Sequence, residues 1–259
     1  MRILIIAPTN FQSYATSVLV KLLDDPKIEV VGVLVHQFTL RRLKNEFKRD
    51  GKRIFLKVLN KALLNEKKSL NYSFQTPKRF LVKSGIKPDL KSICNLNDLY
   101  YKKVNLFNGS KLVQELINLN IDIGAFCGGG LLRENFLNSF SFGVLNCHMG
   151  VLPNFRGMDV VEWPFLENKI DKIGVTCHLM DKGIDTGDIL EIAKVDSTKF
   201  NDFIELREYL SEIMLMLMLK TISSISLGDF KKKKQLQTDG KQYFVMHPSL
   251  KKIAKKIYN

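Results

Sequence analysis

The stretch GVLNCHMGVLPNFRG, residues 143–157, carries an amide and an imidazole, Asn146 and His148, two positions apart at the end of an apolar run. Side chains alternate along a strand, so these two would share one face and Cys147 would lie on the other. An amide donor beside an imidazole can stabilise an oxyanion and move a proton. A histidine that ends a strand is more often only hydrogen-bonded, so the pair by itself leaves a plain polar strand end as the alternative.

Apolar runs and helical patterns alternate on both sides of this stretch. RILIIAP at 2–8 and IEVVGVLV at 28–35 predict buried strands, and SYATSVLVKLL at 13–23 predicts a helix between them. That order is typical of a parallel sheet covered on both faces. The pattern continues with expected helices at 110–120, 133–140, 159–168 (bent or interrupted by Pro164) and about 202–226, and with expected strands at 121–127, 142–148, 173–180 and 189–195. We therefore predict an α/β, Rossmann-like fold with a mostly parallel central sheet.

Composition and charge suggest how the chain is divided. With 259 residues, 45% hydrophobic and 25% charged, we expect a main domain over 1–195 and a C-terminal helix with a basic extension over 196–259. The main domain would contain a basic insertion at about 38–100, which holds 16 Lys/Arg against 5 Asp/Glu, and residues 229–259 hold 9 against 2. Such patches suit a polyanionic partner, although 31 lysines against 9 arginines also fit an AT-rich genome.

Neither the N-terminus nor any other apolar run predicts a membrane span. The apolar N-terminal run is too short for a signal peptide, and IMLMLML at 213–219 falls short of the roughly 20 residues that cross a bilayer. We expect a soluble, cytoplasmic protein with no integral membrane association; a membrane-surface role for the basic helix expected at 40–53 is an alternative. The cysteines follow no zinc-ligand spacing and are expected to be isolated buried thiols: Cys94, Cys127, Cys147 and Cys177.

Two further motifs follow expected strands. DKGIDTGD at 181–188 sets three carboxylates among glycines, where the backbone can bend and bring an aspartate to the sheet; an Asp-rich turn between antiparallel strands is the alternative. Its spacing does not match a calcium loop, so we expect no metal. The glycines 128–130 suit close approach of backbone to a flat ligand, or else a tight turn into a helix. Ligands gather at the carboxyl ends of strands in open α/β sheets, where 146–150 and 181–188 are expected.

Taken in order, CGGGLL at 127–132, NCHMGVLPNFRG at 146–157 and GVTCHLMDKGIDTGDIL at 174–190 resemble the folate-dependent formyltransferases. That family includes methionyl-tRNA, glycinamide ribonucleotide and sugar N-formyltransferases. The resemblance covers roughly 104–195, with a weaker match in 1–35. It implies a formyltransferase that moves a formyl group from 10-formyltetrahydrofolate to an amine.

The resemblance also implies roles for particular residues. Asn146 and His148 would stabilise the oxyanion that forms when the amine attacks, and Asp185, coupled to His148, would help move the proton from the amine to the folate nitrogen. The pterin ring would lie in a slot between the glycine loop and the aspartate loop, with Phe136 as a wall. The implied folate contacts are Gly130, Leu131, Leu132, Phe136, Asp181, Gly183 and Ile184.

Four other positions carry weaker expectations. Pro153 matches a place where the family often has a cis peptide, and Arg156 would either bind an anion or tie down its loop. His178 faces the site, but we expect it to be a core histidine. Met149 stands where these enzymes usually have Pro or Gly, so it is the position expected to mark a departure in acceptor binding.

The acceptor amine is expected to belong to a small, phosphate-bearing molecule, a nucleotide-linked or phosphorylated aminosugar. Only 64 residues follow Val195, too few for the β-barrel that tRNA formyltransferases append, and the loop after the first strand has no glycine-rich turn for glycinamide ribonucleotide. Methionyl-tRNA and glycinamide ribonucleotide remain the alternatives, and a non-catalytic folate- or nucleotide-binding module is a third. The oligomeric state stays open, with a homodimer among the options.

Overall fold

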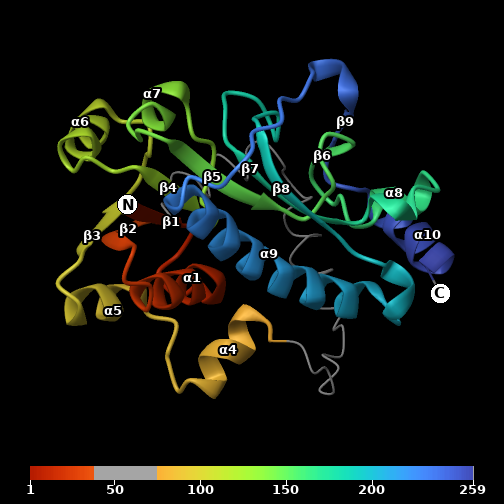
Figure 1. The fold of residues 1–259 in the computed structure, drawn as a ribbon. Helices are drawn as coiled ribbons and strands as arrows, with labels where there is room; N and C mark the ends of the chain where they lie inside the picture. Colours follow the sequence, from red (N-terminus) through yellow and green to blue (C-terminus); the bar gives the residue numbers. More distant parts are fainter. Residues whose placement is uncertain (38–74, 259) are drawn as a thin grey trace.

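The computed structural model describes residues 1–37 and 75–258. Its centre is a seven-stranded sheet in the order β3-β2-β1-β4-β5-β7-β8 (Figure 1). Neighbours from β3 to β5 are parallel, whereas β7 runs antiparallel to both β5 and β8. The predicted mostly parallel α/β sheet is therefore confirmed. The strands are β1 Arg2–Ala7, β2 Glu29–His36, β3 Tyr100–Val104, β4 Ile123–Phe126, β5 Gly143–His148, β7 Gly174–Leu179 and β8 Ile189–Lys194.

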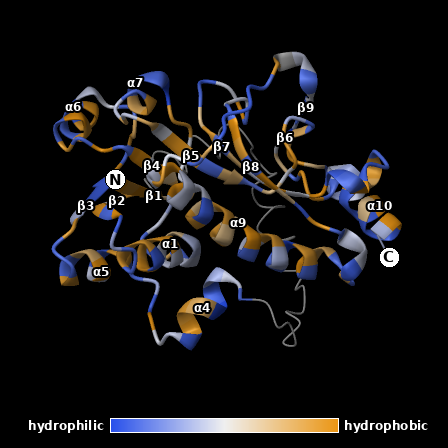
Figure 2. Ribbon diagram, viewed as in Figure 1, coloured by the Kyte–Doolittle hydropathy of each residue, from blue (hydrophilic) through white to orange (hydrophobic). Residues whose placement is uncertain are grey.

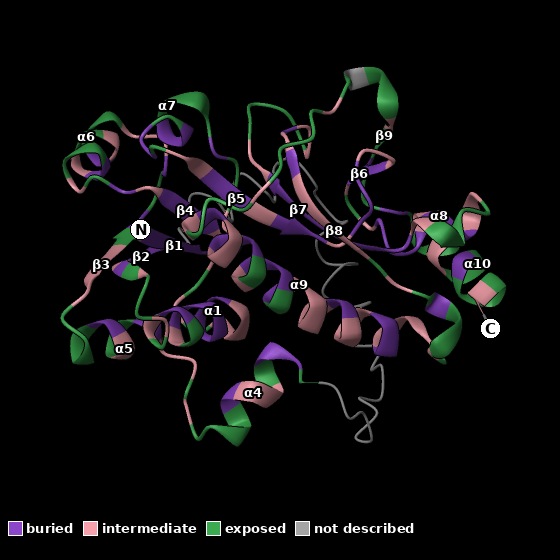
Figure 3. Ribbon diagram, in the orientation of Figure 1, coloured by how far each residue is buried: buried purple, intermediate pink, exposed green. Residues whose placement is uncertain are grey.

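Helices cover both faces of the sheet and create one hydrophobic core on each. α1 (Ser13–Leu23), α5 (Leu90–Leu96) and α9 (Phe203–Ser226) pack on one face, and α6 (Ser110–Asn118) and α7 (Glu134–Leu137) on the other. Strand alternation divides the side chains between the two cores, so the central strands are almost wholly buried (Figure 3). α4 (Pro77–Lys83) packs against α1.

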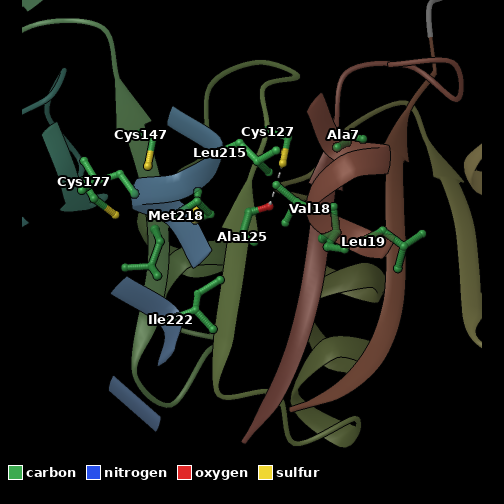
Figure 4. Packing of buried hydrophobic residues seen from close by; sticks show 14 of the residues in the cluster. Ala7, Val18, Leu19, Ala125, Cys127, Cys147, Cys177, Leu215, Met218 and Ile222 are labelled. Carbon is green, nitrogen blue, oxygen red and sulfur yellow. Dashed lines mark hydrogen bonds between the residues drawn. The ribbon is translucent and has the colours of Figure 1, made fainter. Parts of the chain in front are cut away.

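The α9 side of the sheet holds the cysteines. Cys147 of β5 lies directly opposite Cys177 of β7, and both face α9 near Met218 and Ile222 (Figure 4). All four cysteines are buried free thiols, as predicted, although Cys147 and Cys177 are neighbours rather than isolated. Burial raises the pKa of Cys94 to about 12 and that of Cys147 well above its usual value, which makes them unreactive packing residues.

The C-terminal segment folds more than the sequence predicts. β9 (Lys241–Tyr243) pairs in parallel with β6 (Phe155–Gly157), and α10 (Pro248–Tyr258) follows. The helix expected at 159–168 is wrong in extent: α8 spans only Trp163–Leu166, and Pro164 lies in its first turn rather than interrupting it. Proline is favoured at a helix start because the amide proton it lacks has no partner there.

Several expectations concern the ends of the chain or the basic insertion. Of the insertion at 38–100 the structure describes only 75–100, so the helix expected at 40–53 lies outside the described residues. The domain boundary near 195 stays a prediction; α9, just beyond it, packs into the same core as the strands. Among the described residues α9 is also the one helix long and apolar enough to cross a membrane by composition (Figure 2). Nine of its residues are buried in this fold.

Candidate active site

Two neighbouring strands bring polar side chains to the sheet face that lies opposite α9. Asn146 and His148 project from β5 two residues apart, as the alternation predicts. In the antiparallel register, His178 of β7 lies beside Asn146 and Thr176 beside His148. Thr176 Oγ1 donates to the Gly150 carbonyl at 2.8 Å, which ties the turn after β5 to β7.

Asp185 reaches this face from a loop that folds back over the sheet. Because β7 is antiparallel to β5, its end lies beside Val144 and Leu145, near the start of β5 rather than its end. The two motifs thus follow strands, as predicted, but not at the same edge of the sheet. The loop returns toward His148, and Asp185 itself has a left-handed backbone with φ 54°.

The resulting cluster joins the three predicted catalytic residues. His148 Nδ1 lies 3.5 Å from Asp185 Oδ2, and that carboxylate oxygen also accepts from the Gly157 amide at 2.8 Å. His148 Nε2 donates to the Phe155 carbonyl at 2.9 Å. With the proton on Nε2, the neutral ring turns the lone pair of Nδ1 toward Asp185. Nδ1 is therefore the atom that can take up a proton, and Asp185 is placed to stabilise it there.

His178, expected only as a core histidine near the site, also belongs to this cluster. It is only 1% exposed, as a core histidine would be. Its Nε2, however, accepts from Asn146 Nδ2 at 3.2 Å and lies 3.5 Å from Asp185 Oδ1, while Nδ1 donates to the Leu179 carbonyl. His178 thus links Asn146 to Asp185. The sequence feature that could have predicted this role is the position of His178 on the face of β7 that adjoins Asn146.

Burial and charge set the protonation of the cluster. Burial alone would raise the pKa of Asp185, but the imidazoles of His178 and His148, each 3.5 Å from the carboxylate, and the hydrogen bond from the Gly157 amide outweigh it and lower that pKa to about 2. Burial lowers the pKa of His148, an effect that the Asp185 charge partly opposes. The arrangement is an ionised carboxylate beside a neutral imidazole, which suits proton transfer near neutral pH.

The lowered pKa of His148 predicts how stability depends on pH. The unfolded chain binds a proton at His148 near pH 6.5, but the folded chain binds it only at lower pH, so the unfolding free energy should fall as the pH drops below about 6.5. Asp185 contributes to stability in a different pH range. Its contribution to the unfolding free energy is complete above about pH 3.8 and is lost as the pH falls toward 2. Urea unfolding at about pH 7.5 and about pH 5.5 should show a smaller loss for His148→Gln than for the unmutated protein. Equal losses of unfolding free energy in the two proteins would contradict a lowered pKa of His148.

The predicted folate contacts fall into two groups. Gly130 has φ 132° with open space where a side chain would lie, and Leu131 and Ile184 are exposed. The Asp181 carboxylate accepts from the Gly183 amide and from the Thr186 hydroxyl, so it shapes its own loop.

Leu132 and Phe136 lie in the core instead. Phe136 is fully buried, and its ring packs between those of Phe107 and Phe140. The expectation that Phe136 walls the pterin slot stays a prediction; in this structure the rings of Phe107 and Phe140 cover its side chain. Leu132, 2% exposed, packs in the same cluster.

The structure also places the residues with weaker expectations. The Leu152–Pro153 peptide is cis, as predicted. Arg156 is 4% exposed and donates to the Gln235 side chain and to the Leu236 carbonyl at 2.9 Å, so it ties its loop to the C-terminal segment. Met149 is half-buried and packs against the core beside α9. Within 1–37 and 75–258, no group of three or more metal-ligating side chains is arranged to hold an ion.

The chain is similar to known formyltransferases in sequence and in fold. A methionyl-tRNA formyltransferase of Lachnospira eligens is 30% identical over 142 residues, which are 54% of this chain but 45% of the relative, so the match spans under half of that protein. A sugar N-formyltransferase from Shewanella sp. has a TM-score of 0.60 at 14% identity, covering 100% of this chain and 87% of its own.

A second solved structure adds ligands to the comparison. It is an N-formyltransferase from Helicobacter canadensis in complex with folinic acid and dTDP-3-aminofucose, with a TM-score of 0.53 at 17% identity over 94% of this chain and 70% of its own. These likenesses confirm the fold. The formyl transferase family model matches residues 108–212, which carry Asn146, His148, His178 and Asp185. This part of the chain therefore resembles the formyl transferase family in sequence.

Proposed function

We propose that this protein is an N-formyltransferase that moves the formyl group of 10-formyltetrahydrofolate to a primary amine of a nucleotide-linked or phosphorylated aminosugar. The observation that carries the proposal is the cluster of Asn146, His148 and Asp185 within the segment that matches the family model. A binding module would not need an ionised carboxylate 3.5 Å from the free nitrogen of a buried imidazole. We also propose a cytoplasmic location.

The reaction requires charge stabilisation and one proton transfer. The amine nitrogen attacks the formyl carbon, and the carbonyl oxygen becomes an oxyanion that Asn146 and a protonated His148 stabilise. The bond from the formyl carbon to folate N10 then breaks. The amine loses a proton and N10 gains one; Asp185 holds the proton in transit at His148 Nδ1, with a water completing the path.

In this proposal the donor lies beside the glycine loop. Gly128, Gly129 and Gly130 all have φ above 100°, a backbone region that other residues rarely adopt, and the space beside Gly130 is open. Leu131 and Ile184 expose apolar side chains, 66% and 45%, that a flat ring would cover. Leu132 and Phe136 support this loop from the core.

The choice of acceptor rests on the solved neighbours. The similar structures include a sugar N-formyltransferase and an N-formyltransferase in complex with dTDP-3-aminofucose. The name of the curated relatives supports methionyl-tRNA as the second candidate.

An acceptor panel tests this choice. We expect purified protein with 10-formyltetrahydrofolate to formylate nucleotide-linked aminosugars at least about tenfold faster than glycinamide ribonucleotide or charged initiator tRNA, a preference of about 1.4 kcal/mol. Formyl transfer followed by mass spectrometry gives the rates. Formylation of tRNA alone would contradict an aminosugar as the acceptor. Folate binding without any formyl transfer would favour a non-catalytic binding module.

A second prediction concerns the space around His148. A methyl group on Gly150 would lie 2.8 Å from His148 Nε2 and 2.9 Å from the Phe155 carbonyl oxygen, the two atoms that share a hydrogen bond. We expect Gly150→Ala to displace the ring and lower kcat roughly 10- to 100-fold. Gly109→Ala is the control, since its methyl group would meet only the Leu106 carbonyl, at 3.9 Å. Equal rates for the two variants would exclude this role of Gly150.

A further inference from the structure

The C-terminal segment, residues 229–247, packs against the loops of the candidate active site. It lies outside the part of the chain that matches the family model. Lys233 pairs with Ile189 at the start of β8, and β9 pairs with β6 (Figure 1). Between these two attachments, Gln235 turns its side chain toward the backbone of the Asp185 loop.

The Gln235 side chain amide makes four hydrogen bonds. Its Nε2 donates to the Gly187 carbonyl at 2.6 Å and to the Asp185 carbonyl at 3.2 Å, and its Oε1 accepts from Arg156 at 3.1 and 3.3 Å. A guanidinium can only donate and a carbonyl can only accept, so a flipped amide would lose all four bonds. The orientation of Gln235 is therefore determined by its partners.

The bond to Asp185 acts on a left-handed stretch of backbone. Aspartate adopts this conformation more readily than most residues but less readily than glycine, so contacts with its carbonyl help hold φ 54° at Asp185. Gln235 holds the Asp185 carbonyl, and the Gly157 amide holds its carboxylate. Released from Gln235, the loop could relax to an ordinary conformation and carry the carboxylate away from His148.

We infer that Gln235 is a positioning residue that holds the Asp185 carboxylate against His148, so that the C-terminal segment completes the active site. Its effect on catalysis rests on the proposed function, but its effect on the Asp185 loop does not. The competing explanation is that Gln235 acts only by anchoring Arg156.

Two substitutions separate these explanations. Gln235→Glu retains an acceptor for Arg156 but loses the donor to the two loop carbonyls, and Gln235→Met keeps the length of the side chain but loses both functions. Gln242 is exposed on β9 in the same segment, so Gln242→Glu and Gln242→Met are the matched controls. We expect both Gln235 variants to lower kcat roughly 10- to 100-fold, with KM for 10-formyltetrahydrofolate changed less than about threefold. The controls should leave both constants unchanged.

A second measurement does not depend on activity. Asp185 and His178 are the titratable groups that face His148, and the Asp185 charge raises the pKa of His148. If the carboxylate moves away in Gln235→Met, the pKa of His148 should fall further. Proton titration of the ring resonances by NMR measures this, and the chain has only four histidines to assign.

The outcomes are distinct. A normal kcat for Gln235→Glu together with a low kcat for Gln235→Met would mean that the contact with Arg156 matters and would overturn the proposal. An unchanged His148 pKa in folded Gln235→Met would also overturn it. If the unmutated protein transfers no formyl group, the proposed function fails, and the titration still decides the role of Gln235. If Gln235→Met does not fold, as judged by circular dichroism, the kcat of Gln235→Glu decides.

Discussion

Replacement of Asp185 by Asn is expected to lower kcat for formyl transfer about 1000-fold without unfolding the protein. The amide keeps the size of the carboxylate and can still accept from the Gly157 amide, so the loop should keep its shape. It carries no charge, however, and therefore cannot stabilise a proton at His148 Nδ1. Steady-state rates at saturating donor and acceptor measure the effect.

The control for this prediction lies in the same loop. Asp188→Asn makes the same chemical change three residues later, where the backbone carbonyl, which is unchanged, pairs with the Leu179 amide. We expect its kcat to stay within about threefold of the unmutated value. The double variant Asp185→Asn with His148→Ala should be little slower than either single variant. When two residues act as one unit, removing either of them already removes their shared contribution to the rate. Multiplicative losses would mean that the two side chains act independently.

That Asn146, His148 and Asp185 lie together could be predicted partly from local patterns, whereas their catalytic role stays a prediction. Alternation along one strand put Asn146 and His148 on a common face, and the glycines around Asp185 indicated a bend. The family resemblance then joined Asp185 to the pair. The sheet followed in the same way from continuous apolar runs separated by helical patterns.

The remaining parts of the site depend on contacts that no local pattern records. His178 joins the cluster because β7 pairs antiparallel to β5 in one particular register. Gln235 follows a run of four lysines, and it meets Asp185, 50 residues earlier, only because Lys233 pairs with Ile189. Phe136 was predicted to form a wall of the pterin slot. The sequence around it does not reveal that the rings of Phe107 and Phe140 cover its side chain.

Gly157→Ala is expected to lower the free energy of unfolding by about 2 to 4 kcal/mol. Gly157 has φ 95°, which disfavours any side chain, and a methyl group there would lie 2.1 Å from the Tyr243 carbonyl oxygen, too close for β6 and β9 to stay paired. Because the Gly157 amide also donates to Asp185, activity should fall with stability. Urea unfolding measures the first effect and kcat the second.

A matched glycine separates the cost of the backbone conformation from the cost of the close contact. Gly85 has φ 66° with no atom within 4 Å of the position a methyl group would take, so Gly85→Ala should cost only about 1 kcal/mol and leave kcat unchanged. The difference between the two variants then measures what the pairing of β6 with β9 contributes. If Gly157→Ala were no more destabilising than Gly85→Ala, β9 would not be held against β6 in solution. In that case only the pairing of Lys233 with Ile189 would hold Gln235 near the Asp185 loop, because the second attachment of the C-terminal segment would be missing.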